Sequence, residues 1–534
     1  METKPLFRKN ILIRMLQWIA KPVSSQLTFF VLCFVLLNLL DLFVDGGFPL
    51  LSPFLKISFG FFVCYSLLFI STLLPTCVKG IYKSVVLILA VIQFVVDLFL
   101  LIVYGETFSS LHVDMLAAFV ATNTGEVSEY VRTYLTIDVF IIVIASLLSL
   151  FVSFYYLRRL NKIKITWFGE CIIAVVVLVS ASVSLMDYKN FILGNWYFLL
   201  ECESPNLLEY KQEPSVECGD KKPDFIVLVV GESFSREHSS LYNYDKETNP
   251  LLKKLATDSS LFVYNDVVSA CTKTIPAMKS IMTSYVDEMH DSIDWYQCLT
   301  LIEIMQSINY RSVWVSNHSR VGLFDNVSGC FAELCDESVF ANERKLNGYD
   351  EVLLPIIHEI VDSDSLQMFL IVNLMGSHIS YNSRYPASFS NFESDDYVVS
   401  HPHLSDKCRQ TLSEYDNSIL YNDSVVYEII KIFEQKDAFV LYISDHGQDV
   451  FKSSNEYAGH AINGNPVSEQ VSVKIPMFLY TSPVFLNKHP ELYNRIRSTK
   501  NRPYRTDSVM YTIMDVAGIE TVNGVSYKHK SLFK

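Results

Sequence analysis

The chain has little positive charge. Its 534 residues include 43 Lys and Arg against 57 Asp and Glu, which gives a net charge of −14 at pH 7. A nucleic-acid-binding protein needs a basic face to neutralise phosphates, so this balance argues against nucleic acid as a partner. Hydrophobic residues make up 50% of the chain and concentrate in its first third. That share is too large for one soluble enzyme and predicts a membrane domain followed by a soluble domain.

Basic residues are also missing from every second connection of the apolar first third. Five apolar runs there are long enough to cross a bilayer. They cover 27–44, 57–76, 84–104, 137–157 and 168–186. The segment 45–54 has no Lys or Arg, and 105–136 has only Arg132, whereas the N-terminal arm and the other turns are basic. The positive-inside rule therefore predicts a cytoplasmic N-terminus, with everything after the fifth run outside the inner membrane.

A cleavage site of the A-x-A type is lacking behind the first apolar run, and a long basic arm precedes that run. Both features favour an uncleaved span over a signal peptide. Seven of the 11 cysteines follow the fifth run, on the oxidising side in this topology. Cys330 and Cys335 are close enough in sequence for a local disulfide, and Cys202 with Cys218 for one that staples the linker. Spacing alone leaves the pairing open.

The rest of the chain has ordinary composition and alternates between strand and helix patterns. Apolar strands are expected at 225–230, 312–315, 368–373, 438–443 and 475–479, and helices at 275–284, 299–308, 351–361 and 417–433. This alternation predicts a doubly wound α/β domain. The expected organisation is a five-span α-helical membrane domain at 1–187 with an outer loop at 105–136, an interfacial linker at 188–222, and the α/β domain at 223–534.

Metal-binding side chains follow the predicted strands. Ligand sites of open α/β sheets lie at the carboxyl ends of strands. Residues of this kind are Glu232 after the first strand, Asp445 and His446 after the fourth, and His378 and His460 in nearby turns. Each has an ordinary alternative when taken alone, such as a helix-capping acid or a core histidine. Together, carboxylates and imidazoles form a donor set that suits zinc.

A hydroxyl side chain lies at the start of a predicted helix. Pro276 suits a first helical turn, so Thr274 is expected near the helix N-terminus, where backbone N–H groups favour an anionic oxygen. Beside a divalent metal, such a hydroxyl loses its proton and attacks phosphorus. A helix cap is the ordinary alternative for Thr274, and Thr272 is eligible for the same chemistry.

Several short motifs carry a resemblance. They include Gly231-Glu232-Ser233, Gly376-Ser377-His378, Tyr415-Asp416-Asn417 and Ser444-Asp445-His446-Gly447. With them the whole chain resembles the membrane-bound phosphoethanolamine transferases of Gram-negative bacteria, which include the mobile colistin-resistance enzymes. The catalytic domain of those enzymes belongs to the alkaline phosphatase/sulfatase superfamily. The resemblance therefore implies that fold for 223–534.

The resemblance also implies roles for the candidate residues. The implied ligands of a catalytic zinc are Glu232, Thr274, Asp445 and His446, with Thr274 as the nucleophile. It further implies that His378 and His460 bind a second zinc or the substrate phosphate, so the number of zinc ions stays open. Aligned with the sulfatase nucleophile motif, Thr274-Ile275-Pro276-Ala277 falls in register, which favours Thr274 over Thr272.

The implied reaction moves phosphoethanolamine from phosphatidylethanolamine to lipid A or the lipopolysaccharide core through a phospho-threonine intermediate. Substrate contacts are expected from Thr122 and Glu126 in the outer loop and from Asn317, His318 and Arg320. The added ammonium group would offset phosphate charge and weaken the binding of cationic peptides, as in polymyxin resistance. Alternatives are a membrane-tethered sulfatase or phosphodiesterase that releases its product to water, and a glycerophosphate transferase with another lipid donor.

Overall fold

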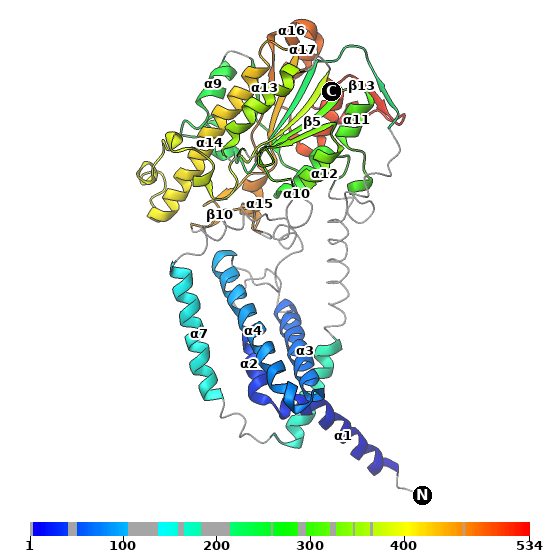
Figure 1. The fold of residues 1–534 in the computed structure, drawn as a ribbon, viewed down its shortest axis with the longest axis vertical. Coiled ribbons are helices and arrows are strands. Elements are labelled where there is room, and N and C mark those ends of the chain that lie inside the picture. The colour runs from blue at the N-terminus through cyan, green and yellow to red at the C-terminus, as the bar shows by residue number, and fades with distance from the viewer. Residues whose placement is uncertain are drawn as a thin grey trace. The chain divides into compact units, whose positions relative to one another are not determined.

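The structure is a computed structural model that describes most of the chain. The described residues are 4–40, 51–104, 137–157, 165–182, 214–257, 260–286, 295–320, 327–344, 346, 348–363, 367–455, 457–462 and 465–534. The chain divides into two compact units, Met1–Glu201 and Cys202–Lys534. Figure 1 shows the helices and strands of each unit.

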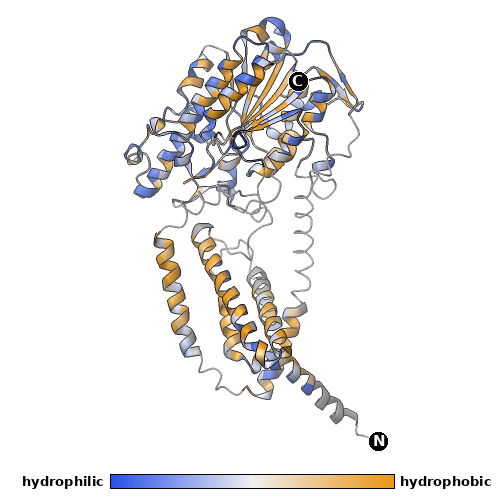
Figure 2. Ribbon diagram, in the orientation of Figure 1, coloured by the Kyte–Doolittle hydropathy of each residue, from blue (hydrophilic) through white to orange (hydrophobic). Residues whose placement is uncertain are grey.

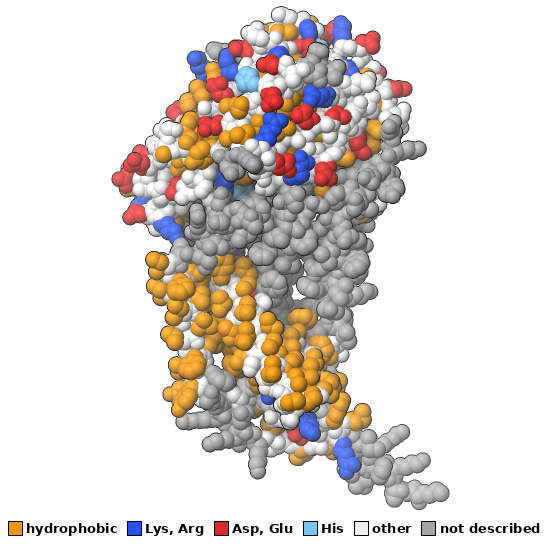
Figure 3. Space-filling view, in the orientation of Figure 1, with side chains coloured by type: hydrophobic (Ala, Val, Ile, Leu, Met, Phe, Trp, Pro, Cys, Tyr) orange, Lys and Arg blue, Asp and Glu red, His pale blue; other side chains and the backbone are white. Residues whose placement is uncertain are grey.

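The N-terminal unit is helical and apolar. Its helices include α1 (Lys4–Ser24), α2 (Leu27–Asn38), α3 (Leu51–Leu73), α4 (Thr76–Tyr104) and α7 (Ile137–Leu157). Hydrophobic residues run along these helices (Figure 2) and cover the face in view (Figure 3). Phe140, Phe151 and Tyr155 of α7 are among the exposed ones. In water such surfaces would be unfavourable, so their exposure fits a unit that faces lipid.

Fewer clear spans are present than the five that the sequence predicts. Among the described residues, Thr76–Ile102 is long and apolar enough to cross a membrane by itself. The pair Ile13–Ser24 and Leu27–Asn38 passes as a second span only if its two helices count as one, since they are bent by 68°. Shorter apolar helices lie at Ile57–Leu73, Val139–Ser153 and Trp167–Ser182. The structure therefore supports one or two spans, and five remains a prediction.

Two predicted segments fall wholly or partly outside the described residues. The outer loop 105–136, with Thr122 and Glu126, lies outside them, as does most of the predicted linker. The end of that linker is described and forms β1 (Val216–Cys218), which pairs antiparallel with β13 (Ile519–Val522). This end is therefore tied to the second unit.

The second unit contains a seven-stranded sheet. Its order is β3-β11-β8-β2-β7-β5-β6, where the strands are β2 (Phe225–Gly231), β3 (Leu261–Tyr264), β5 (Arg311–Ser316), β6 (Glu337–Phe340), β7 (Met368–Asn373), β8 (Ala438–Ser444) and β11 (Met477–Thr481). The five strands from β8 to β6 are parallel, whereas β11 runs antiparallel to both of its neighbours. All five predicted strands are present in a mixed sheet. The sequence analysis missed β3 and β6.

Helices cover both faces of this sheet (Figure 1). One core lies under α10 (Thr274–Met282), α11 (Leu301–Ser307), α12 (Val327–Leu334) and α18 (Val509–Val516). The other core lies under α9 (Pro250–Thr257), α13 (Leu353–Ser363) and α14 (Asp406–Ile432). The strands β2 and β8 are buried along their whole length, which explains their unbroken apolar runs. The doubly wound architecture is thus present, and it leaves only strand ends free for polar chemistry.

The cysteines do not form the local disulfide suggested by their spacing. Cys335 is a free cysteine, and its thiol donates to the carbonyl oxygen of Phe331 at 3.6 Å. The suggested bridge from Cys330 to Cys335 is therefore wrong in this structure. Cys218 is also a free cysteine, and Cys202, its suggested partner, lies outside the described residues. A five-residue spacing within a helix and its end does not by itself bring two thiols together.

Candidate metal centre

The register of two neighbouring strands brings two acids together. In the parallel pair β2 and β8, Gly231 lies opposite Ser444, so the next residues are Glu232 and Asp445. The Asp445 N–H continues the ladder by donating to the Gly231 carbonyl at 2.9 Å. Only 3% of Glu232 and 1% of Asp445 is exposed. Two carboxylates are thus buried side by side, an arrangement that needs compensating positive charge.

The threonine preferred from the sequence lies next to this acid pair. Helix α10 begins at Thr274, and the Thr274 Oγ1 atom lies 3.2 Å from Glu232 Oε2 and 3.2 Å from His446 Nε2. Thr272 lies two residues earlier, in the turn ahead of the helix. The hydroxyl of Thr274 therefore has both a carboxylate that accepts its proton and a helix N-terminus that favours the resulting charge.

Histidine side chains complete the cluster. The Nδ1 atom of His446 donates to the Gly447 carbonyl at 2.7 Å, which turns Nε2 toward Glu232 Oε1 at 3.3 Å and Asp445 Oδ2 at 3.5 Å. The rings of His446 and His460 have centroids 5.0 Å apart. One ligand atom each from Glu232, His446 and His460 fits within 4.8 Å. His460 therefore lies with Glu232 and His446, two of the ligands implied for the catalytic zinc. It also interacts electrostatically with His378, the residue with which it is paired in the sequence-based prediction.

The charges of this cluster depend on one another. Burial lowers the pKa of His446, but the charges of Asp445 and Glu232 outweigh it and raise that pKa to about 9. Burial, with the charge of Glu232, raises the pKa of Asp445 to about 8. Burial also acts to raise the pKa of Glu232, but the hydrogen bond and charge of His446 hold it well below its ordinary value. The acids thus draw a positive charge to this point.

A tight loop places His378 beside the acid pair. The Ser377 N–H donates to the Glu232 carbonyl at 3.0 Å. Gly376 has a φ of +53°, and a Cβ atom there would lie 2.8 Å from both the backbone N and O of Glu232. The Asp350 carboxylate fixes the loop by accepting the N–H groups of Met375 at 3.0 Å and Gly376 at 2.8 Å. Glycine is required here by both conformation and space.

Among the residues that the structure describes, the buried polar atoms without a hydrogen-bond partner include one atom each of two candidate ligands. These two atoms are Asp445 Oδ2 and His378 Nδ1. Burial outweighs the opposing charge of Glu232 and lowers the pKa of His378 to about 3. Burial, with the charge of His446, lowers the pKa of His460 to about 4. Neutral imidazoles and carboxylates are the ligand forms that zinc takes. The unpartnered atoms and the donor types therefore fit a zinc centre.

The predicted substrate contacts after β5 already have protein partners. Asn317 Nδ2 donates to Asp350 Oδ1 at 2.9 Å, and His318 Nε2 lies 2.9 Å from the Leu374 carbonyl oxygen. Arg320 pairs with both oxygens of Glu343 at 2.7 and 3.1 Å. The structure places the first two residues next to the loop that carries His378. It does not by itself assign any of the three to a substrate.

Three residues that support the centre have no sequence feature that indicates this role. They are Ser233, Gln448 and Asp350, whose side chains hydrogen-bond to Glu232, to Ser233 and to the His378 loop respectively. Ser233 belongs to a quoted motif, but nothing in its spacing indicates a partner 215 residues away. Asp350 precedes a helix and looks like an ordinary capping acid. Such long-range partners have no local sequence signal.

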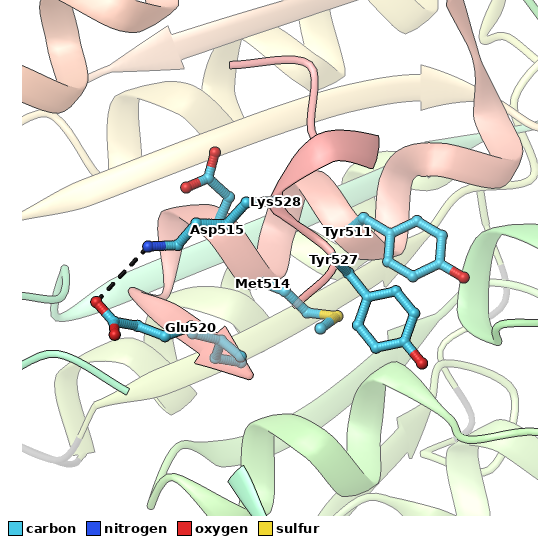
Figure 4. Close-up of a pocket in the computed structure, with 7 residues that line it drawn as sticks. Tyr511, Met514, Asp515, Glu520, Tyr527 and Lys528 are labelled. Carbon is cyan, nitrogen blue, oxygen red and sulfur yellow. Dashed lines mark ion pairs between the residues drawn. The ribbon is translucent and has the colours of Figure 1, made fainter. Parts of the chain in front are cut away.

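A separate small hollow lies far along the chain, between α18 and β13 (Figure 4). Tyr511, Met514 and Tyr527 are among its lining residues, and its volume is about 10 Å³. An ion pair between Lys528 and Glu520 at 3.6 Å lies at its edge. This space is about that of one water molecule, so it does not accommodate a phosphate ester. The metal cluster remains the stronger candidate site.

Comparison with known proteins finds a family and relatives that this chain resembles. The sulfatase family model matches residues 224–519, which span the sheet and the whole metal cluster. Phosphoethanolamine transferase EptC of Escherichia coli is 27% identical over 456 residues, covering 78% of this chain and 76% of its own. Phosphoethanolamine transferase CptA of Salmonella typhimurium is 27% identical over 457 residues, with the same coverage. The resemblance to phosphoethanolamine transferases is thus confirmed.

Solved structures agree with the fold. The C-terminal periplasmic domain of EptC from Escherichia coli, in complex with Zn, is 28% identical with a TM-score of 0.54, and the match covers 60% of this chain and 88% of that one. The integral membrane phosphoethanolamine transferase EptA from Neisseria meningitidis has a TM-score of 0.61 over 97% of this chain and 98% of that one. At 17% identity the second match speaks for the fold alone.

Proposed function

The chain belongs to the sulfatase family, and on that premise we propose that it transfers phosphoethanolamine from phosphatidylethanolamine to lipid A or the lipopolysaccharide core. One observation carries this proposal: Thr274 Oγ1 lies 3.2 Å from both Glu232 Oε2 and His446 Nε2 at a zinc-type donor set. A hydroxyl in that position suits a covalent phosphoryl-transfer intermediate. The similarity to EptC and CptA supports phosphoethanolamine as the group that moves.

In this proposal the donor set holds zinc. Its ligands are Glu232, Thr274, Asp445 and His446, and His378 and His460 bind the phosphate or a second zinc. The proximity of His460 to Glu232 and His446 supports a shared role for it. Bound zinc would polarise the phosphoryl oxygens and lower the pKa of the threonine hydroxyl.

The chain's own residues then perform two displacements. Glu232 Oε2 accepts the proton of Thr274 Oγ1, and this oxygen forms a bond to the donor phosphorus while the bond to the diacylglycerol oxygen breaks. The diacylglycerol oxygen takes up the proton from Glu232 as it leaves, and Thr274 carries phosphoethanolamine. An acceptor oxygen next attacks the same phosphorus, loses its proton, and returns the hydroxyl to Thr274. The α10 N-terminus favours negative charge on this oxygen in both steps.

The membrane unit fits substrates that are both amphiphiles. We propose five spans, a cytoplasmic N-terminus and a catalytic domain in the periplasm, which the alternation of basic and base-poor connections supports. The outer loop 105–136 then lies on the side of the catalytic domain, where Thr122 and Glu126 contact the donor head group. Asn317, His318 and Arg320 follow β5 at the same sheet edge as the centre and are the proposed contacts there.

The nucleophile is tested with purified full-length protein in detergent, loaded with zinc and given phosphatidylethanolamine labelled in its head group. The labelled phosphoethanolamine is expected on the peptide that contains Thr274. Thr274→Ala should reduce transfer by about 10³-fold or more, whereas Thr272→Ala should stay within about threefold of wild type. Label on Thr272, or full activity of Thr274→Ala, would contradict the assignment.

The reaction class is tested by mass spectrometry of lipopolysaccharide from cells with and without the chain. Added phosphoethanolamine is expected on lipid A or the core, and its position identifies the acceptor. Free ethanolamine phosphate with unmodified lipopolysaccharide would indicate a hydrolase instead. A parallel assay with labelled phosphatidylglycerol separates the proposed donor from that of a glycerophosphate transferase.

A further inference from the structure

A hydrogen-bonded chain of side chains leads to Glu232 from the far side of the centre. Gln448 Nε2 donates to Ser233 Oγ at 2.9 Å, and Ser233 Oγ donates to Glu232 Oε1 at 2.5 Å. Gln448 and Ser233 are 1% and 0% exposed. These hydrogen bonds are therefore shielded from water. Hydrogen bonds are stronger in such a buried environment than in water.

The direction of this chain follows from the chemistry of its members. An amide N–H group only donates, so Ser233 receives from Gln448 and directs its single proton to Glu232 Oε1. That carboxylate oxygen is thereby occupied. The other oxygen, Oε2, is the one closer to Thr274 Oγ1, at 3.2 Å against 3.4 Å. The hydroxyl of Ser233 thus fixes the orientation of the Glu232 carboxylate, with Oε2 the oxygen nearer to the nucleophile.

Ser233 is itself held in an unusual conformation. Its φ of +61° is left-handed, a region that disfavours residues other than glycine and costs about 1 kcal/mol or more. Its N–H donates to Asp445 Oδ1 at 3.0 Å. Tyr415 Oη donates to the Ser233 carbonyl at 2.8 Å and accepts the N–H of Ser235 at 2.9 Å. One strained residue therefore contacts both acids of the centre, through its side chain and its backbone.

We propose that Ser233 is a positioning residue for the metal centre and that Gln448 acts through it. This role rests on the proposed zinc site. The Ser233 hydroxyl orients the Glu232 carboxylate so that Oε2 points to the cation and to Thr274. Partners that orient a metal ligand in this way commonly contribute 10- to 100-fold to metal affinity. The strain at Ser233 is the cost of placing its hydroxyl and its N–H on two different acids.

The same kind of hydrogen-bonded Gln–Ser–acid series occurs elsewhere in the fold and provides a control. Gln306 Nε2 donates to Ser312 Oγ at 2.8 Å, and Ser312 Oγ donates to Asp336 Oδ2 at 2.8 Å. Ser312 is also fully buried. This chain ties the end of α11 to the start of β5 and lies at the opposite end of β5 from Asn317. Substitutions in it should therefore affect stability and leave the metal centre unchanged.

The test measures zinc affinity of full-length protein by chelator competition, together with its melting temperature. Ser233→Ala and Ser233→Gly are both expected to weaken zinc binding by about 10- to 100-fold. Gly accepts the left-handed φ without strain, so Ser233→Gly should keep or raise the melting temperature while it loses affinity. Ser312→Ala and Gln306→Leu should lower the melting temperature and leave zinc affinity within about twofold of wild type.

Coupling between the two positions tests the second half of the proposal. Gln448→Leu should weaken zinc binding by only about two- to fivefold, because Ser233 still donates to Glu232. The double variant Ser233→Ala/Gln448→Leu should bind zinc no more weakly than Ser233→Ala alone. Full additivity of the two effects would overturn the role of Gln448.

Unchanged zinc affinity in both Ser233 variants would overturn the role of Ser233, as would a wild-type protein that binds no zinc. The outcome is distinguishable from failure of the proposed reaction, because zinc affinity is measured without substrate. A protein that binds zinc as predicted but leaves Thr274 unlabelled by phosphatidylethanolamine would overturn the transferase and keep the positioning role.

Discussion

The strands β2 and β8 have acids at both ends, and the acids at the two ends have different partners. At the amino ends, Lys488 Nζ lies 3.0 Å from Asp224 Oδ2 and 3.2 Å from Asp437 Oδ2. His489 Nε2 lies 3.1 Å from the same oxygen of Asp437. Lys488 thus pairs with both acids at the amino ends.

At the carboxyl ends, Glu232 and Asp445 face imidazoles. Burial lowers the pKa of His446, but the charges of these two acids outweigh it and raise that pKa to about 9. The acid pair at the amino ends faces a lysine cation, whereas the pair at the carboxyl ends lies among the imidazoles of the proposed zinc site. The difference separates a structural edge of the sheet from a functional edge.

The largest effect is expected when one acid at each edge is neutralised. Asp445→Asn removes a proposed metal ligand, so zinc affinity should fall by about 100-fold or more. Asp437→Asn leaves Lys488 and His489 without their carboxylate and should destabilise the fold by about 1–3 kcal/mol with zinc affinity unchanged. Chelator competition and melting temperature, measured on both variants, check this. If Asp437→Asn also lost zinc affinity, the amino and carboxyl ends of β2 and β8 would not differ in function as proposed.

The next effect concerns the loop at the functional edge. In Gly376→Ala, the added Cβ would lie 2.8 Å from the Glu232 backbone at a φ of +53°. Glu232 and His378 must then shift, and transfer should fall by about 10- to 100-fold because small misplacements at reacting centres are costly. Steady-state transfer assays measure this. Gly524→Ala is the control, since it has a φ of +74° with open space around it, and it should retain activity.

Another buried acid, Asp423, has backbone N–H groups as its partners. Asp423 on α14 accepts the backbone N–H groups of Leu251 and Leu252, at 2.9 and 3.0 Å. Burial outweighs these donors and raises the pKa of Asp423 from 3.8 to about 7. The folded state therefore binds this proton more tightly than the unfolded state does, and stability should be lost as pH rises from about 4 to 7.

Melting curves of wild type and Asp423→Asn across that pH range measure this loss. Three pKa units correspond to about 4 kcal/mol at most, so the wild-type melting temperature should fall by several degrees relative to the variant. Asn cannot ionise, and the difference between the two curves removes the effect of Asp445, which titrates in the same direction. A difference that does not change with pH would show that Asp423 keeps an ordinary pKa.

The smallest effect is expected at Arg320. Its guanidinium group already pairs with Glu343 and lies 4.4 Å above the Phe340 ring. Because these contacts occupy the charge, Arg320→Gln should change transfer by no more than about threefold. A rise in KM of tenfold or more with kcat unchanged would instead support the substrate contact expected from the sequence.

Local features of the sequence were sufficient for the framework. Short apolar runs predicted β2, β5, β7, β8 and β11 because a strand buried on both faces must be apolar along its length. The same reasoning placed Glu232, Asp445 and His446 at strand ends, and Pro276 predicted the helix start near Thr274. Strand β6, with the mixed pattern of Glu337–Phe340, escaped because a half-buried edge strand has a weaker apolar signal.

Tertiary structure alone decided which of these side chains meet. The parallel register of β2 and β8 placed Glu232 beside Asp445. The antiparallel pairing of residues 449–450 with 458–459 returned the backbone so that His460 lies by His446, and Ser233 reached Gln448 across 215 residues. Apolar periodicity reports burial, which is a local property, so the sequence determined the strands and the residue types at their ends. Hydrogen bonds and metal geometry depend on distances between distant segments, and only the packed sheet sets those distances.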